Sequence, residues 1–174
     1  ILWDSLAASP TRMEVEGNYG DSFPAIHARI ISASIRKILP LITKEKIGVV
    51  IINQLKTRVG VMFGEQYTSF GGRSLKYHAS LRIRVDRTGY IKTSKGEIVG
   101  ITVRARIIKN KIAVPFKEAN YDFYFDKGID NWSSILDLAE KQGKVTKKGG
   151  FYCVDNERFR KKDAKNSKFL KEFN

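Results

Sequence analysis

The sequence has few of the residues that build disulfides and metal sites. Cys153 is the only cysteine among 174 residues, which excludes an internal disulfide framework and a zinc site built from cysteines. The two histidines, His27 and His78, lie far apart, and no carboxylate cluster accompanies them. Thiol catalysis and metal-dependent hydrolysis are therefore poor interpretations of this chain.

Long hydrophobic runs are also missing. No apolar stretch approaches the ~20 residues that cross a bilayer, and no cationic-then-apolar signal peptide opens the chain. Together with the single cysteine, these absences fit a reducing compartment. We expect a cytoplasmic protein with no membrane partner.

Two catalytic motifs do not occur. The Gly-x-Ser-x-Gly elbow of acyl-transfer enzymes is absent, and so is Gly-x-x-x-x-Gly-Lys-Ser/Thr, the loop that holds nucleotide phosphates. The segment Gly71-Gly72-Arg73-Ser74 is glycine-rich, but its spacing is wrong. Either the chain never bound nucleotide, or the phosphate-binding loop lies upstream of residue 1.

Positive charge is abundant. The chain has 32 Lys+Arg against 18 Asp+Glu, a net charge of +14. Such a surplus predicts a polyanionic partner, with nucleic acid first and an anionic membrane surface a distant second. The composition becomes strongly basic after Lys141, and we place a domain boundary near Gly128, between residues 1–128 and 129–174.

Hydrophobic periodicity predicts an α/β fold. Helical spacing from Ile26 to Leu39 predicts a helix that is capped by Asp21 or Ser22, has Pro24 in its first turn, and ends or kinks at Pro40. The apolar run 48–53 predicts a strand buried on both faces of a parallel sheet. Alternation in 80–85 and 101–108 predicts antiparallel neighbours, with strand 121–125 and helix 130–143 after them. Residues 56–72 lack periodicity and predict a functional loop.

Several polar residues follow predicted strands. Residues 1–5 are typical of the tail of a buried strand that ends in an acidic residue, so we expect the chain to be the C-terminal portion of a longer protein. An aspartate at such a strand end, here Asp4, can bind Mg²⁺ through water. Gln54 follows the buried strand, where parallel sheets place ligands. Lys109 and Lys111 alternate, so both ammonium groups can converge on one anion. Each of these residues also has a simpler structural explanation. Asp4 could be an ordinary acid at a strand end, Gln54 could cap the strand, and the two lysines could be solvated.

The 56–72 loop mixes cations with apolar side chains among glycines. That mixture suits single-stranded nucleic acid, because cations follow the phosphates while apolar groups stack on bases. The alternative is that these side chains fold back into the core. The residues concerned are Lys56, Arg58, Val59, Met62, Phe63, Tyr67 and Phe70.

A series of short motifs runs through almost the whole chain. They are Asp4-Ser5-Leu6-Ala7-Ala8, Glu14-Val15-Glu16-Gly17, Gly20-Asp21-Ser22, Ile52-Asn53-Gln54, Gly60-Val61-Met62-Phe63-Gly64, Gly71-Gly72, Leu75-Lys76, Lys109-Asn110-Lys111-Ile112-Ala113 and Pro115-Phe116-Lys117. In this order, and at nearly this spacing, they resemble the RecA family of recombinases, of bacterial or phage type.

The resemblance implies a fold. It is a RecA-like P-loop NTPase core with a mostly parallel sheet flanked by helices and an antiparallel extension. The N-terminal Walker A half would be missing from residues 1–128, and residues 129–174 would form a small basic α/β C-terminal domain.

The resemblance also implies nucleotide chemistry with ATP and Mg²⁺. Asp4 would be the Walker B aspartate, Gln54 would sense the γ-phosphate, and Lys109 and Lys111 would reach the ATP of a neighbouring subunit. Ser5, Lys76 and Pro115 would lie at the same nucleotide site. The complete protein would be a DNA-dependent ATPase, and the chain alone would be inactive.

Finally, the resemblance implies single- and double-stranded DNA as partners, in helical filaments that promote homologous pairing, strand exchange and DNA repair. Residues 16–24 and 55–70 would be the two DNA-binding loops. The DNA contacts would come from Ser32, Arg36, Lys56, Arg58, Val59, Phe63, Gly71, Gly72 and Arg73. Two other hypotheses stay open: a nucleotide-independent nucleic-acid-binding α/β module, and a RecA-fold helicase or motor.

Overall fold

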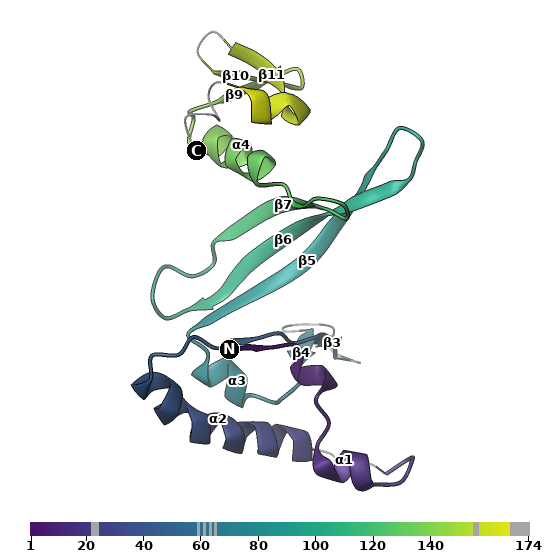
Figure 1. Cartoon of the computed structure of the whole chain (residues 1–174), viewed down its shortest axis with the longest axis vertical. Helices are drawn as coiled ribbons and strands as arrows, with labels where there is room; N and C mark the ends of the chain where they lie inside the picture. The colour runs from purple at the N-terminus through teal and green to yellow at the C-terminus, as the bar shows by residue number, and fades with distance from the viewer. Residues whose placement is uncertain are drawn as a thin grey trace. The chain divides into compact units, whose positions relative to one another are not determined.

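The computed structural model describes residues 1–21, 25–58, 60, 62, 64, 66–154 and 157–167, with the backbone only at 162, 165 and 166. The chain divides into two compact units, Ile1–Ala79 and Ser80–Asn174 (Figure 1). The boundary predicted after residue 128 stays a prediction, for a finer division of the second unit. None of the described helices is long and apolar enough to span a membrane.

The first unit contains two short parallel strands. β1 (Leu2–Trp3) pairs with β2 (Val50–Ile51). Trp3 and Ile51 pack on the core of the unit, whereas Leu2 and Val50 point to the opposite face, and Val50 is 59% exposed. The prediction of a strand buried on both faces is therefore wrong for this chain, because neighbouring residues of a strand alternate between faces and one face here is open.

The long helix of this unit is α2 (Ile26–Lys44). Ile31 and Ile35, one turn apart, are buried against Leu6, as the apolar spacing predicted. The predicted cap is wrong for Asp21: the helix begins after Ala25, and the Asp21 carboxylate accepts a hydrogen bond from the backbone N–H of Asn18 at 2.9 Å. Ser22 and Pro24 lie outside the described residues.

α2 continues past Pro40, so the predicted end of the helix at this proline is wrong, whereas the alternative, a kink at Pro40, stays a prediction. Proline removes one backbone donor, the one that would bond the carbonyl of Arg36. Arg36 and Pro40 are both exposed, so water can bond to the carbonyl of Arg36 instead. The helix therefore continues for a further turn, to Lys44.

Short elements complete the first unit. β3 (Leu55–Thr57) and β4 (Tyr67–Ser69) form an antiparallel hairpin, so the predicted irregular loop contains regular structure. Strands of three residues are too short for a period of two to be recognised. The remaining elements are η1 (Leu6–Ala8), α1 (Arg12–Glu16) and α3 (Ser74–His78).

The second unit is built on an antiparallel sheet in the order β5-β6-β7-β8. Its two long strands are β5 (Leu81–Lys92) and β6 (Ile98–Asn110), which confirms the predicted antiparallel pairing. Gly89 lies in β5 and pairs with Thr102 of β6, next to a register shift. The shorter strands are β7 (Glu118–Tyr124) and β8 (Gly128–Ile129), of which β7 was predicted.

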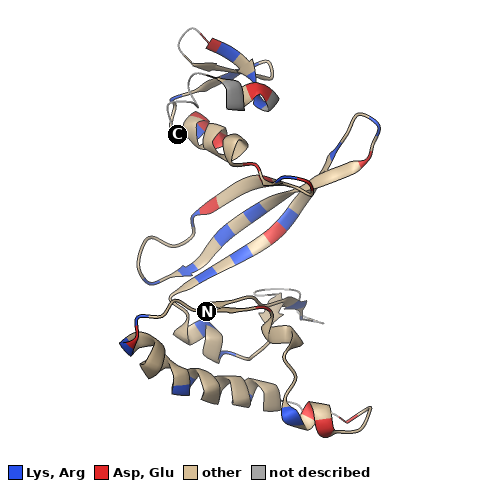
Figure 2. Ribbon diagram, viewed as in Figure 1, with Lys and Arg blue, Asp and Glu red and all other residues tan. Residues whose placement is uncertain are grey.

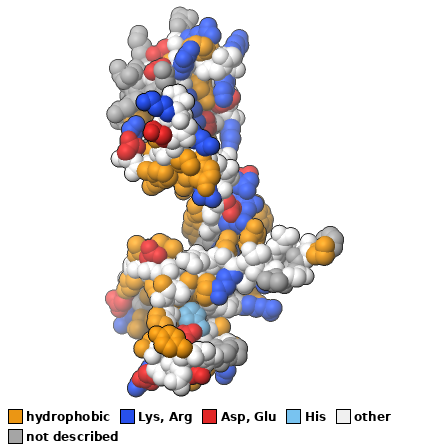
Figure 3. All heavy atoms as spheres, turned by 90° about the vertical axis from the view of Figure 1, so that its right-hand side faces the viewer, with side chains coloured by type: hydrophobic (Ala, Val, Ile, Leu, Met, Phe, Trp, Pro, Cys, Tyr) orange, Lys and Arg blue, Asp and Glu red, His pale blue; other side chains and the backbone are white. Residues whose placement is uncertain are grey.

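Side chains along β5 alternate between two different faces. Ile83 and Val85 share the apolar face, and they are 53% and 59% exposed. Arg84 shares the polar face with Arg106 of β6, and its side chain is only 19% exposed. The Arg84 side chain on the polar face is thus less exposed to solvent than Ile83 and Val85 on the apolar face. Figure 3 shows hydrophobic side chains at the molecular surface.

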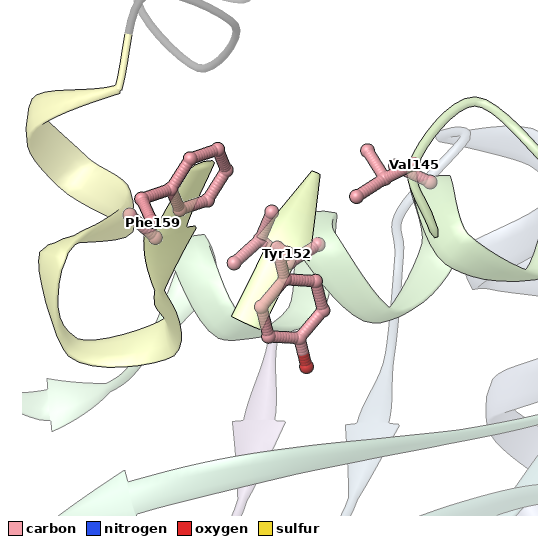
Figure 4. Close-up of a cluster of buried hydrophobic side chains, with 6 residues drawn as sticks. Val145, Tyr152 and Phe159 are labelled. Carbon is pink, nitrogen blue, oxygen red and sulfur yellow. The ribbon is translucent and has the colours of Figure 1, made fainter. Parts of the chain in front are cut away.

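The end of the second unit has its own hydrophobic cluster. The residue before α4 (Asn131–Lys141) is its N-cap, Asp130, whose carboxylate accepts a hydrogen bond from the backbone N–H of Ser133 at 3.1 Å. Figure 4 shows Val145, Tyr152 and Phe159 of the cluster, and the two rings stack with centroids 6.3 Å apart. The other elements are β9 (Thr146–Lys148), β10 (Phe151–Val154), β11 (Glu157–Arg160) and η2 (Lys161–Asn166).

The described strands are mainly antiparallel. β1 and β2 form the parallel pair, and the other three sheets are antiparallel. The predicted α/β class with an antiparallel extension is present, but the mostly parallel sheet is represented in the described residues by two short strands.

Candidate functional site

The carboxyl ends of β1 and β2 meet at one edge of the parallel pair. The backbone N–H of Ile52 donates to the carbonyl of Trp3 at 2.9 Å, and the N–H of Leu6 donates to the carbonyl of Ile52 at 3.0 Å. Asp4 and Ser5 lie between those two bonds, and Gln54 follows two residues after Ile52. Asp4 and Gln54 are exposed, so an acid and an amide are available at the same strand ends.

The segment after β1 is held by side chains that the sequence did not single out as positioning groups. Trp3 Nε1 donates to Ser9 Oγ at 2.9 Å, and Ser9 Oγ donates to the carbonyl of Ser5 at 3.1 Å. His27 Nε2 lies 3.0 Å from the carbonyl oxygen of Ser9. These contacts tie the Asp4-Ser5 segment to α2, and no sequence periodicity reports them.

Gly71 and Gly72 pack closely against the first unit's core. Both have left-handed backbone conformations, with φ of +81° and +70°. A methyl group on Gly71 would come to 2.7 Å from Leu6 Cδ2, and one on Gly72 would come to 2.9 Å from the Cβ of Ala28. Only glycine fits these two positions without a shift of the neighbours.

The contact between Gly72 and Ala28 relates the glycine pair to Ser32 and Arg36 of α2. Ala28, Ser32 and Arg36 are spaced by four residues, so they lie along one side of the helix. Gly72 touches the first of them. The structure therefore brings Gly71 and Gly72 to the same side of α2 as Ser32 and Arg36. Arg73, the next residue, is exposed at the start of α3.

The hairpin of β3 and β4 carries part of the predicted DNA-binding segment. Lys56 Nζ lies 3.4 Å from the centroid of the Phe70 ring, a cation–π contact. The backbone N–H of Arg58 donates to the carbonyl of Gln66 at 2.8 Å, and both Lys56 and Arg58 are exposed. Val59 and Phe63, also predicted to contact DNA, lie outside the described residues.

In the second unit, Lys109 and Lys111 stand at the end of β6. Lys109 pairs with Arg82 of β5, and the N–H of Lys111 donates to the carbonyl of Ser80 at 2.9 Å. The pKa of Lys109 is lowered from 10.5 by desolvation and by the positive charges of Lys111 and Arg82. The three cations therefore influence one another electrostatically.

The turn after β6 is shaped by Asn110. Its Oδ1 accepts from the backbone N–H groups of Ile112 at 3.0 Å and Ala113 at 3.1 Å. Pro115 is half-buried in the same connection. Lys76 lies in α3 of the first unit. The shared nucleotide site predicted for Lys76, Lys109, Lys111 and Pro115 stays a prediction.

The polar face of β5 and β6 carries more arginines than the sequence analysis considered. Arg84 Nε lies 2.8 Å from one oxygen of Asp86, and Arg106 Nη2 lies 3.1 Å from the other. Burial alone would raise the pKa of Asp86, but the hydrogen bonds from these arginines lower it overall. Figure 2 shows Lys and Arg along both strands. Cations at alternate positions 82, 84, 104 and 106 were the available signal.

His, Cys, Asp and Glu side chains are the usual protein ligands of metal ions. Within the part of the chain that the structure describes, no group of three or more such residues could hold a metal ion. Asp4 is an exposed carboxylate and belongs to no such group among the described residues. The Mg²⁺ contact through water stays a prediction for that residue.

Comparison with known proteins places the chain in a family. A family model described as RecA N-terminal domain matches residues 1–130, and the chain belongs to this family, as its motifs indicated. The chain is 40% identical to Protein RecA of Caulobacter sp. (strain K31) over 158 residues, which are 91% of this chain and 44% of that protein. It is 38% identical to Protein RecA of Ruegeria pomeroyi over 172 residues, 99% of this chain and 49% of that protein. The chain thus spans less than half the length of these relatives.

Proposed function

We propose that this chain is the rear part of a RecA-like P-loop ATPase that carries out homologous recombination and DNA repair in the cytoplasm. Family membership supports the class. The observation that carries the mechanism is the position of Asp4 and Gln54 in the segments that follow the paired carboxyl ends of β1 and β2. Ligands bind at the carboxyl ends of parallel strands in open α/β sheets, which is where these two side chains lie.

The residues present fit a magnesium nucleotide. Mg²⁺ would neutralise phosphate charge, with Asp4 holding it through water and Ser5 beside it. Gln54 would donate its amide to the γ-phosphate. The phosphate-binding loop is not in this sequence. ATP hydrolysis is therefore proposed for an intact protein that contains such a loop.

Lys109 and Lys111 act on the nucleotide of the neighbouring subunit, together with Lys76 and Pro115. Desolvation, and after it the charges of Lys111 and Arg82, lower the pKa of Lys109, and a bound anion would offset the repulsion among these cations. Each charge-assisted hydrogen bond to the γ-phosphate contributes about 1.5–3 kcal/mol. Through these contacts Lys109 and Lys111 would help to hold the subunits of a helical filament together, and loss of the γ-phosphate would remove the contacts.

DNA binding uses the first unit. Arg36, Lys56, Arg58 and Arg73 supply exposed cations, Ser32 a hydroxyl, and Gly71 and Gly72 backbone N–H groups. Contacts of this kind go to phosphates, so they position single- or double-stranded DNA without selecting a sequence. Val59 and Phe63 would add apolar contacts to bases. Base pairing with an incoming duplex supplies the homology test.

Gln54 immediately precedes β3, so the nucleotide and DNA contacts are adjacent in the chain. If Gln54 lost its contact with the γ-phosphate, the 55–70 segment would change from an ordered to a disordered state. The basic residues 129–174 form the small C-terminal domain of this proposal, next to the core portion 1–128.

The test uses the intact protein with Lys109 and Lys111 both changed to alanine. We expect loss of single-stranded-DNA-dependent ATP hydrolysis and of filaments, measured by phosphate release and electron microscopy. The matched control is the Lys92→Ala, Lys95→Ala double variant, which removes the same charge from exposed positions of the β5–β6 hairpin and keeps both activities.

Three outcomes contradict parts of the proposal. Normal turnover without Lys109 and Lys111 overturns the assignment across the subunit interface. DNA binding without any ATPase activity in the intact protein favours a passive nucleic-acid-binding module. ATP-driven unwinding without strand exchange favours a RecA-fold helicase.

A further inference from the structure

The side-chain amide of Asn53 joins the two ends of residues 54–70. Its Nδ2 donates to the backbone carbonyl of Phe70 at 2.9 Å, across seventeen positions of the sequence. Its Oδ1 accepts from the backbone N–H of Gln54 at 2.9 Å. One planar group thus bonds the residue that opens this segment and the residue that closes it.

The two bonds also fix the orientation of the amide. Exchanging its oxygen and nitrogen would set the oxygen against the Phe70 carbonyl and the NH₂ group against the Gln54 N–H. Both contacts would then become repulsive. An aspartate, which has two oxygens, could keep the acceptor contact to Gln54 but not the donor contact to Phe70.

The closing residue is connected to rigid parts of the unit. Phe70 precedes Gly71, which packs against Leu6, Leu75 and Ile31 in the core. Its ring also lies under the ammonium group of Lys56, at 3.4 Å. Between the two ends, the first rung of the hairpin joins Leu55 to Ser69. The Asn53 bonds therefore lie directly beside the root of the hairpin.

We propose that Asn53 is a positioning residue that closes the 54–70 segment and transmits the position of Gln54 to Phe70 and the glycine pair. The inference rests on the proposed function for its DNA-binding consequence, but not for its structural part. Movement of the Gln54 backbone must either break the bond to Oδ1 or carry Asn53 with it. In the second case the Phe70 carbonyl follows, and with it the contact to Lys56.

The structural test measures amide hydrogen exchange by NMR in the full 174-residue chain. In Asn53→Ala we expect faster exchange at Gln54 and in β3 and β4, by up to about tenfold for each hydrogen bond removed. In Asn53→Asp we expect Gln54 to stay protected while β3 and β4 exchange faster, because only the donor is removed. The control, Asn131→Ala at an exposed position of α4, leaves both regions unchanged.

The outcome that overturns the inference is equally specific. Unchanged exchange at Gln54 in Asn53→Ala, or unchanged exchange in the hairpin of Asn53→Asp, shows that the amide does not close the segment. Unaltered amides in α2, which belongs to the same unit as Asn53, establish that this unit is folded in each variant. Because aspartate has nearly the size of asparagine, Asn53→Asp decides the question if Asn53→Ala does not fold.

The functional test measures the affinity of the intact protein and its variants for an oligothymidylate at several salt concentrations. We expect both Asn53 variants to bind more weakly, with a salt slope reduced by roughly 0.7 for each phosphate that the protein no longer neutralises. A loosened hairpin with unchanged affinity overturns the link to DNA. If the unaltered protein binds no DNA, the proposed function fails, while the exchange experiment still decides the role of Asn53.

Discussion

Gly72 lies against Ala28 so closely that a methyl group on the glycine would come to 2.9 Å from the alanine Cβ. Ala28 stands one turn before Ser32 on α2. The backbone of the segment after β4 is therefore held against the helix side that carries the proposed phosphate contacts. Glycine is required there for two separate reasons, the positive φ and the close approach.

Gly72→Ala is expected to lower the free energy of unfolding by about 1–3 kcal/mol, because it adds the strain of a left-handed alanine and a clash with Ala28. The measurement is urea denaturation. Gly60→Ala is the matched control, since Gly60 also has a positive φ, +82°, but a methyl group on it would meet no heavy atom of the described residues within 4 Å. Equal losses in the two variants would show that the close approach contributes nothing.

Arg36→Ala is expected to make the salt dependence of single-stranded DNA binding less steep, by roughly 0.7 in the slope of log K against log salt concentration. Fluorescence anisotropy at several salt concentrations measures the slope. The control is Lys37→Ala, which removes the same charge from the next residue of α2, about 100° around the helix. If both variants change the slope equally, net charge rather than the Ser32–Arg36 side of the helix governs binding.

Lys111→Ala is expected to raise the pKa of Lys109, because one of the neighbouring positive charges that lower it is removed. Since the pKa of Lys109 lies below 10.5, anion binding at this pair should weaken as pH rises through that lowered value. The measurement is an NMR titration of the lysine side chains, with and without inorganic triphosphate. Lys95→Ala serves as the control, and a Lys109 pKa that does not respond to Lys111→Ala would contradict the electrostatic coupling.

Lys161→Met is expected to destabilise the second unit by about 1 kcal/mol, a modest loss because the ion pair is partly exposed to water. Lys161 Nζ lies 3.5 Å from Asp137 Oδ2 and 3.7 Å from Asp122 Oδ2. Burial lowers the pKa of Lys161, but Asp137 and Asp122 raise it overall above 10.5. The contribution is therefore complete below pH 10.5 and is lost as pH rises through the raised pKa.

Thermal or urea unfolding as a function of pH checks this prediction. Lys127→Met is the control, because the Lys127 side chain is 75% exposed and its ammonium lies 3.9 Å from Asp126. A loss of stability in Lys161→Met that persists unchanged well above the raised pKa would show that packing of the side chain, rather than its charge, is responsible.

Much of the local structure could be predicted because it depends on nearest neighbours along the chain. The apolar spacing of α2 placed Ile31 and Ile35 on one side of the helix, and both are buried. Alternation gave β5 and β6, and Asp130 marked the beginning of α4. The motifs also identified the family, because their order and spacing are visible in the sequence without any knowledge of contacts.

The sequence determined periodicity, charge and family membership, but only the tertiary structure decided which distant groups meet. The bonds of Asn53 to Phe70, the fit of Gly72 against Ala28 and the pairing of Asp86 with Arg84 and Arg106 were not predicted. Helix and strand periods follow from the covalent geometry of adjacent residues, so a linear pattern reports them. Contacts between remote residues depend on how whole elements pack, and no short stretch of sequence contains that information.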